Sequence, residues 1–137
     1  MVRLDNGVKM LILTGEYGEG HKQAALAIRE ACGIRMSGVE TMVVDFMEWT
    51  HPRTYAWSKQ LFIEGIRKFP SLYGYLYRKT KTANMFSKGL KRVTVSGLGR
   101  LVKLLGDMNP SVVVSTFPFA AAAMSYLKTN GVTRVPT

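Results

Sequence analysis

Val8-Lys9-Met10-Leu11-Ile12-Leu13-Thr14 is followed directly by Gly15-Glu16-Tyr17-Gly18-Glu19-Gly20-His21 in this chain of 137 residues. The first seven residues are mostly apolar, which is typical of a short strand buried on both faces of a parallel sheet. After the glycine-rich stretch, a helix is expected to end at Gly33. Its apolar positions recur at helical spacing: Ala24, Ala27, Ile28 and Ala31. Strand, glycine loop and helix together predict the start of a Rossmann-like α/β sheet.

Two further β-rich runs extend this pattern. Val39 to Phe46 predicts a second strand and Ser111 to Ser115 a third, and a right-handed crossover makes the sheet parallel. An alanine-rich helix is expected from Phe119 to about Leu127, and Val132 to Thr137 resembles the start of another strand. Residues 1–137 therefore predict one Rossmann-like domain with helices flanking its sheet.

The pattern changes at about residue 50. Pro52 and Pro70 bracket one helical stretch, and a longer helix is expected from about Asn84 to Gly106. Its predicted apolar stripe consists of Phe86, Leu90, Val93, Gly97, Leu101 and Leu104. We interpret residues 50–106 as a helical insertion between elements of the core.

The formal charge of +10 is concentrated in this insertion, because 12 of the 19 Lys and Arg residues lie between Arg53 and Lys103, where Glu64 is the only acid. Aromatic residues are interleaved with these cations. Such a surface suits an anionic bilayer, where each cation contributes about 1 kcal/mol and aromatic rings lie at headgroup level. The predicted membrane-binding residues are Trp57, Arg67, Lys68, Arg78, Lys79, Lys88 and Arg92.

Two other interpretations of the insertion remain open. The aromatic rings can belong to the core while the cations face solvent. Single-stranded nucleic acid also binds cations and stacking rings, but this interpretation explains neither the glycine loop nor His21, so no nucleic-acid partner is expected. No apolar run approaches the roughly 20 residues of a membrane span. The single Cys32 excludes an internal disulfide, and the N-terminus does not resemble a signal peptide, so we expect a cytoplasmic protein.

The strongest local signal is the loop Gly18-Glu19-Gly20 with His21 after it. Glycines let a ligand approach the backbone, and free amides at a helix start suit an anion. The pattern is neither a P-loop nor the dinucleotide fingerprint, so a simple tight turn is an equally good interpretation. The positive end of the helix dipole favours a neutral imidazole at His21, which makes it a candidate general base, although a capping or packing role is the alternative.

The order and spacing of Gly18-Glu19-Gly20-His21-Lys22-Gln23-Ala24-Ala25 and Ser115-Thr116-Phe117-Pro118 resemble the N-terminal domain of the monogalactosyldiacylglycerol synthase and processive diacylglycerol glucosyltransferase family. The similarity extends over nearly the whole chain. It implies a GT-B glycosyltransferase with two Rossmann-like domains facing a cleft, in which the N-terminal domain holds the lipid acceptor and the C-terminal domain binds a UDP-sugar. It also implies inverting hexose transfer to diacylglycerol, with no essential metal and no cofactor.

The resemblance assigns roles to residues of this chain. His21 would be the base that deprotonates the diacylglycerol hydroxyl, and Gly18, Glu19 and Gly20 would form the loop under the reacting centre. Thr116, Phe117 and Pro118 would line the acceptor cleft.

Nothing in the sequence corresponds to the family's donor-binding domain. We therefore expect this chain to be inactive alone and to require a separate or missing C-terminal domain, acting as a peripheral protein at the inner face of the cell membrane. The alternative function is a non-catalytic membrane-binding or interaction module left by truncation. Neither interpretation distinguishes glucose from galactose as the sugar.

Overall fold

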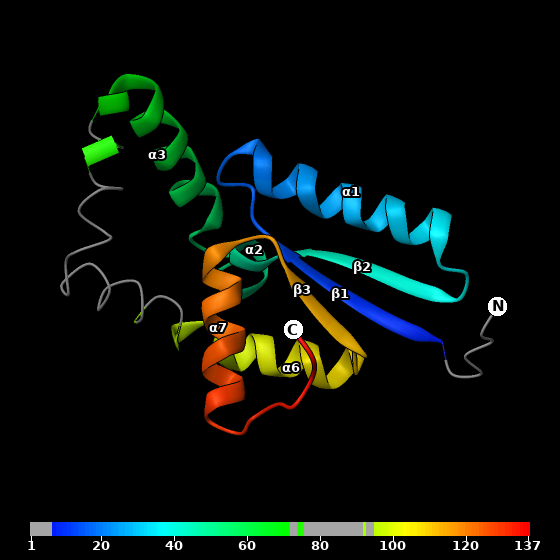
Figure 1. Ribbon diagram of the computed structural model, residues 1–137. Coiled ribbons are helices and arrows are strands. Elements are labelled where there is room, and N and C mark those ends of the chain that lie inside the picture. The colour runs from blue at the N-terminus through cyan, green and yellow to red at the C-terminus, as the bar shows by residue number, and fades with distance from the viewer. Residues whose placement is uncertain (1–6, 72–73, 76–91, 93–94) are drawn as a thin grey trace.

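The computed structural model describes residues 7–71, 74–75, 92 and 95–137. These residues contain a three-stranded parallel sheet of order β2-β1-β3 (Figure 1). Its strands are β1 (Val8–Thr14), β2 (Val39–Asp45) and β3 (Val112–Ser115). All three lie where the sequence predicts strands, and the α/β Rossmann-like fold class is confirmed. Phe46, expected at the end of the second strand, instead begins a helix.

Helices cover both faces of the sheet in Figure 1. The helix α1 (Glu19–Arg35) packs on one face against β1 and β2. On the other face lie α6 (Leu98–Met108) and α7 (Pro118–Thr129). The short α2 (Phe46–Thr50) directly follows β2, and α3 (Tyr55–Lys68) projects beyond the carboxyl end of the sheet. The carboxyl end of the sheet therefore differs from the amino end, because α3 and the loops that follow the strands lie there.

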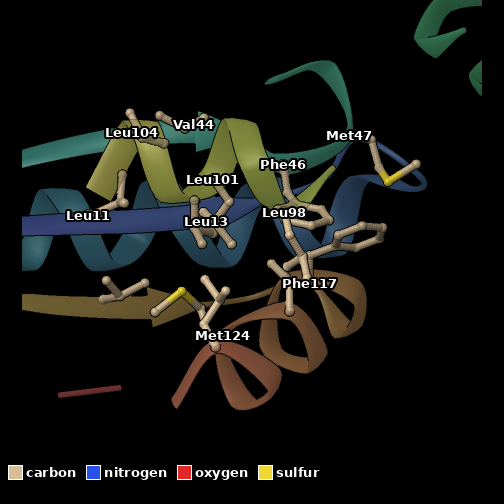
Figure 2. Packing of buried hydrophobic residues seen from close by; sticks show 14 residues of the cluster. Leu11, Leu13, Val44, Phe46, Met47, Leu98, Leu101, Leu104, Phe117 and Met124 are labelled. Carbon is tan, nitrogen blue, oxygen red and sulfur yellow. The ribbon is translucent and has the colours of Figure 1, made fainter. Parts of the chain in front are cut away.

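The central strand β1 organises the core. Leu11, Ile12 and Leu13 are fully buried because β1 has a hydrogen-bonded neighbour on each edge and helices over both faces. Side chains alternate between the faces of a strand, so Leu11 and Leu13 point toward α6 and α7, whereas Ile12 points toward α1. Figure 2 shows apolar side chains of α6 and α7 gathered around Leu11 and Leu13. Those labelled are Leu98, Leu101, Leu104 and Met124.

The predicted face of α1 is confirmed only at Ile28, and its predicted end is wrong. Ala24, Ala27 and Ala31 are exposed, and the face toward the sheet is formed by His21, Ala25, Ile28 and Cys32. The helix also continues through Gly33 to Arg35, because Gly33 keeps a negative φ and the helical bond from the Met36 amide to the Cys32 carbonyl is made. Small residues on several faces of this helix left its orientation ambiguous. The Cys32 thiol is buried.

The predicted long helix from Asn84 to Gly106 is confirmed only in its last part. Phe86, Leu90 and Val93 lie outside the described residues, a turn occurs at Gly97, and α6 runs to Met108. Leu101 and Leu104 are buried as expected, with Leu98 beside them, so the end of the predicted insertion belongs to a core helix. The helix ends two residues beyond the expected Gly106, where Asn109 has a φ of 48° and caps it in a left-handed conformation.

The final residues do not form the expected strand. Val132 to Thr137 are irregular, yet they run beside β3, where the Val113 amide donates a hydrogen bond of 2.9 Å to the carbonyl oxygen of Pro136. The predicted alanine-rich helix is confirmed, but it begins one residue earlier, at Pro118, and ends two residues later, at Thr129.

The α6 contact with the sheet yields a direct test of the core. Leu101 is 1% exposed, so Leu101→Ala removes buried methyl groups and is expected to lower the free energy of unfolding by about 2–5 kcal/mol. The neighbouring Val102 is 39% exposed, and Val102→Ala is expected to cost less than about 1 kcal/mol. Urea denaturation measures both, and equal losses would contradict the observed orientation of α6.

Candidate active site

The carboxyl ends of all three strands meet at one edge of the sheet. Thr14 is paired with Asp45, and Leu13 is paired with Ser115, so the segments that follow these residues are neighbours. The predicted glycine loop follows Thr14, and the predicted acceptor residues follow Ser115. Open parallel sheets bind ligands at this edge. The structure therefore brings together the loop, His21 and Thr116, which are far apart in the sequence.

The glycine loop places His21 in the first turn of α1. Gly18 has a φ of 96°, a conformation that favours glycine, and α1 then begins at Glu19. Gly18, Glu19 and Gly20 are exposed, and His21 is half-buried as the third residue of the helix. The amides of a first helical turn have no partner within the helix, so they are available to a ligand. Among the described residues, none hydrogen-bonds to the His21 imidazole nitrogens.

Thr116 fixes the backbone of His21. Its hydroxyl oxygen lies 2.9 Å from both the His21 carbonyl oxygen and the Thr14 Oγ1. Because a hydroxyl has one proton, Thr116 donates to the carbonyl and accepts from Thr14. The Thr116 amide in turn donates to the carbonyl of Leu13. The first turn of α1 is thereby joined to β1 and to the end of β3.

Phe117 supports the loop through its ring. It is only 4% exposed, stacks on Tyr17 at a centroid separation of 5.9 Å and forms a T-shaped contact with the His21 ring at 5.5 Å. A Cβ at Gly15 would lie 2.8 Å from the Phe117 ring, so glycine is required for this approach. Pro118 is exposed at the first position of α7. Of the three predicted acceptor residues, Phe117 thus packs behind the loop, whereas Pro118 faces solvent.

A cluster of charged side chains, which sequence reasoning missed, lies beside the loop. The Glu16 carboxylate accepts a hydrogen bond of 2.7 Å from Lys22 Nζ through one oxygen and pairs with Lys59 Nζ through the other. We call Glu16, Lys22, Asp45, Tyr55 and Lys59 the Glu16 cluster. Its two lysines lower the pKa of Glu16 to about 2, and the same carboxylate raises the pKa of Lys22.

Asp45 joins the cluster to the sheet. Its Oδ1 caps α2 by accepting from the Glu48 amide, while its Oδ2 accepts from the Glu16 amide at 3.0 Å and from the Tyr55 hydroxyl at 2.9 Å. Burial, and then the Asp45 carboxylate, raise the pKa of Tyr55 well above its ordinary value. Asp45 therefore both caps α2 and holds the glycine loop.

Tyr17 connects the loop to α3. Its hydroxyl is hydrogen-bonded to Ser58 Oγ, and its ring meets the Phe62 ring edge-on at 5.3 Å. The Tyr55 ring lies in a similar edge-on arrangement at 6.5 Å. These partners are about 40 residues away in the sequence, and no local spacing signals such a contact.

The outer surface of α3 is apolar as well as basic. Trp57 is 69% exposed and Leu61, one turn later, is 59% exposed, while Arg67 and Lys68 are exposed at its end. Arg92 is also exposed, and the predicted membrane-binding residues Arg78, Lys79 and Lys88 lie outside the described residues. No helix in the described ranges has the length and apolar character needed to span a bilayer.

The Glu16 ion pairs predict a pH dependence of stability. The folded-state pKa is depressed from 4.5 to about 2, so the stabilisation is present above pH 4.5 and is lost as the pH falls toward 2. Because these side chains are partly exposed, the effect is expected to be below about 1 kcal/mol. Urea denaturation of the wild type and Glu16→Gln should give unfolding free energies that converge over this range, and a constant difference would contradict the assignment.

Comparison with known proteins identifies a family to which most of the chain is similar. A family model described as monogalactosyldiacylglycerol (MGDG) synthase matches residues 21–137, beginning at His21. A processive diacylglycerol beta-glucosyltransferase of Bacillus cytotoxicus is 30% identical over 115 residues, and that of Bacillus subtilis is 28% identical over 122 residues. No solved structure gives a significant match.

The similarity covers most of this chain but a smaller part of its relatives. The aligned residues make up 82% of the chain and 29% of the Bacillus cytotoxicus protein, and 84% and 30% for the Bacillus subtilis protein. The chain therefore spans about three tenths of the length of these curated relatives. The family match, over residues 21–137 of 137, shows that this chain belongs to the monogalactosyldiacylglycerol synthase family.

Proposed function

We propose that this chain is the acceptor-side domain of a glycosyltransferase that moves a hexose from a UDP-sugar to diacylglycerol at a membrane surface. Family membership and the names of the Bacillus relatives support this reaction class. The observation that carries the proposal is the position of His21, which is held at the carboxyl edge of the sheet by Thr116 and Phe117.

His21 is proposed as the general base. Its imidazole accepts the proton of the diacylglycerol hydroxyl while the hydroxyl oxygen forms a bond to the anomeric carbon of the sugar. The bond from that carbon to UDP breaks at the same centre, and the attack from the opposite face inverts its configuration. A base must lie within hydrogen-bond distance of the proton that it removes, so a fixed histidine backbone contributes directly to the rate. This step requires neither a metal nor a cofactor.

The surroundings of His21 leave room for an acceptor. Gly18 and Gly20 have no side chains, and space around their Cβ positions is open, so substrate can approach the loop backbone there. Thr116 and Pro118 lie at the adjacent strand end and are proposed to line the acceptor cleft, with Phe117 supporting it from within the fold. Glu19 is exposed in the same turn and belongs to the proposed loop under the reacting centre.

The UDP-sugar is proposed to bind mainly to a C-terminal domain, as a separate chain or as additional sequence. This proposal is supported by the relatives' greater length, because the chain aligns with only 29% and 30% of them. In this proposal, residues 1–137 alone bind the acceptor but do not catalyse hexose transfer.

The membrane surface is proposed to contact α3, at the inner face of the cell membrane. Trp57 and Leu61 form an exposed apolar strip one helical turn apart, with Arg67 and Lys68 beyond it. Aromatic rings at headgroup level and cations near anionic lipids both favour binding. Membrane contact through these α3 residues would not require His21. The exposed residues of α3 therefore support a second candidate function, a membrane-binding module without catalysis.

The base is tested by replacing His21 in this chain joined to the C-terminal part of the Bacillus subtilis relative. His21→Gln is expected to lower sugar incorporation into diacylglycerol by about 10²- to 10⁴-fold, because proton removal then lacks a base. His51→Gln is the matched control, because the chain has two histidines and His51 bonds to Thr50 and Ser96 away from the loop. Full activity in His21→Gln would refute the base, and vesicle binding without any turnover in the unmodified joined protein would favour the non-catalytic module.

Membrane docking is tested on the chain itself by sedimentation with vesicles of phosphatidylglycerol and phosphatidylcholine. Trp57→Ala is expected to weaken binding by about tenfold, because a large exposed ring no longer leaves water. Tyr126→Ala on α7, where the ring is also partly exposed, serves as the control and is expected to bind as the wild type does. Binding should also weaken as salt rises. Equal affinities for Trp57→Ala and the wild type would contradict docking through α3.

A further inference from the structure

One carboxylate connects the helix α3 with the helix turn that carries His21. Glu16 binds Lys59 of α3 through Oε2 and Lys22, the neighbour of His21 in α1, through Oε1. The Tyr55 hydroxyl of α3 lies 3.3 Å from the same Oε2. Glu16 therefore forms a bridge between Lys22 of α1 and Lys59 of α3.

The bridge matters because core packing holds α3 only at its start. No residue of this 14-residue helix is buried, and Tyr55, its first residue, packs partly buried against the core. The first two turns are also held to the loop by polar and ring contacts: the Glu16–Lys59 ion pair, the hydrogen bonds of Tyr55 to Asp45 and of Tyr17 to Ser58, and the ring contacts of Tyr17 with Tyr55 and Phe62. A change in the position of α3 would therefore change the position of the loop through these contacts.

The loop is in turn connected to His21 through a small number of contacts. The Glu16 amide is bonded to Asp45, and Gly15 is packed against the Phe117 ring, so the loop backbone has few alternative positions. The Phe117 ring also contacts His21, and Lys22 joins the first turn of α1 to Glu16. The depressed pKa keeps Glu16 ionised throughout the neutral range, so the bridge is present whenever the enzyme is at work.

We propose that Glu16 is a positioning residue through which docking of α3 on an anionic lipid surface restrains the glycine loop and His21. The inference rests on the proposed membrane docking of α3. It adds that lipid binding and the geometry of the base are coupled through the Glu16–Lys59 contact. The acceptor diacylglycerol lies in the same lipid surface. The coupling would therefore restrain His21 when the protein is bound to the membrane that contains its acceptor.

The experiment is hydrogen exchange followed by mass spectrometry on the 137-residue chain, with and without vesicles of phosphatidylglycerol and phosphatidylcholine. Exchange is measured in the peptides that cover the glycine loop and α3. Lys59→Gln removes the cation that binds Glu16, and Lys59→Arg keeps it. Lys103→Gln is the control, because it removes one cation and one ion pair of α6 with Asp107 without touching the loop.

In the wild type, anionic vesicles are expected to slow exchange in both α3 and the loop. In Lys59→Gln the α3 peptide should still be protected, whereas protection of the loop should fall by about two- to fivefold, the range expected for one partly exposed ion pair. Lys59→Arg and Lys103→Gln should behave as the wild type. Circular dichroism verifies that each variant has the wild-type helix content.

Each contrary result has a distinct meaning. Protection of α3 without any change in the wild-type loop would overturn the coupling and leave the proposed docking intact. Equal loop protection in Lys59→Gln and the wild type would overturn the role of Glu16. Absence of vesicle protection at α3 in the wild type would refute the docking of α3 and the coupling that depends on it.

Discussion

The parallel pairing of β1 with β2 on one edge and β3 on the other is the constraint on which the site depends. Its register sets Thr14 beside Asp45 and Leu13 beside Ser115, so three loops leave the sheet together. Burial of Leu11 and Leu13 under α6 and α7 holds that register, because a slip of one residue would turn both side chains to the other face. The loop, the α2 cap and Thr116 have their positions as a consequence.

The parts predicted from sequence are those with a local signal. Each strand is a short run rich in β-branched or other apolar residues next to glycine, proline or a polar residue, and the loop before His21 is marked by its glycines. The orientation of α1 was missed because alanines on several sides of the helix give no clear apolar face. The Glu16 cluster was missed for a different reason: Lys59 is 43 positions from Glu16, and only the folded chain brings them together.

Asp45 illustrates how a small domain joins several elements with one side chain. Its two oxygens serve the start of α2, the backbone of the glycine loop and the first turn of α3. Because a carboxylate has several acceptor positions, one residue satisfies all three partners. The site is therefore held by polar contacts on its outer side and by the Phe117 ring on its inner side.

The stripe formed by His21, Ala25, Ile28 and Cys32 limits which changes in the length of α1 the site can accommodate. These residues face the sheet together, with Cys32 Sγ against Met10 Sδ at 3.8 Å. Deleting one residue between His21 and Ala25 would rotate the histidine by about 100° around the helix axis, away from Phe117. Substitutions in the exposed alanines are compatible with this arrangement, whereas length changes in the first turns of α1 are not. The position of the His21 ring against Phe117 therefore depends on its spacing from the buried Ala25 and not on the identity of the exposed residues between them.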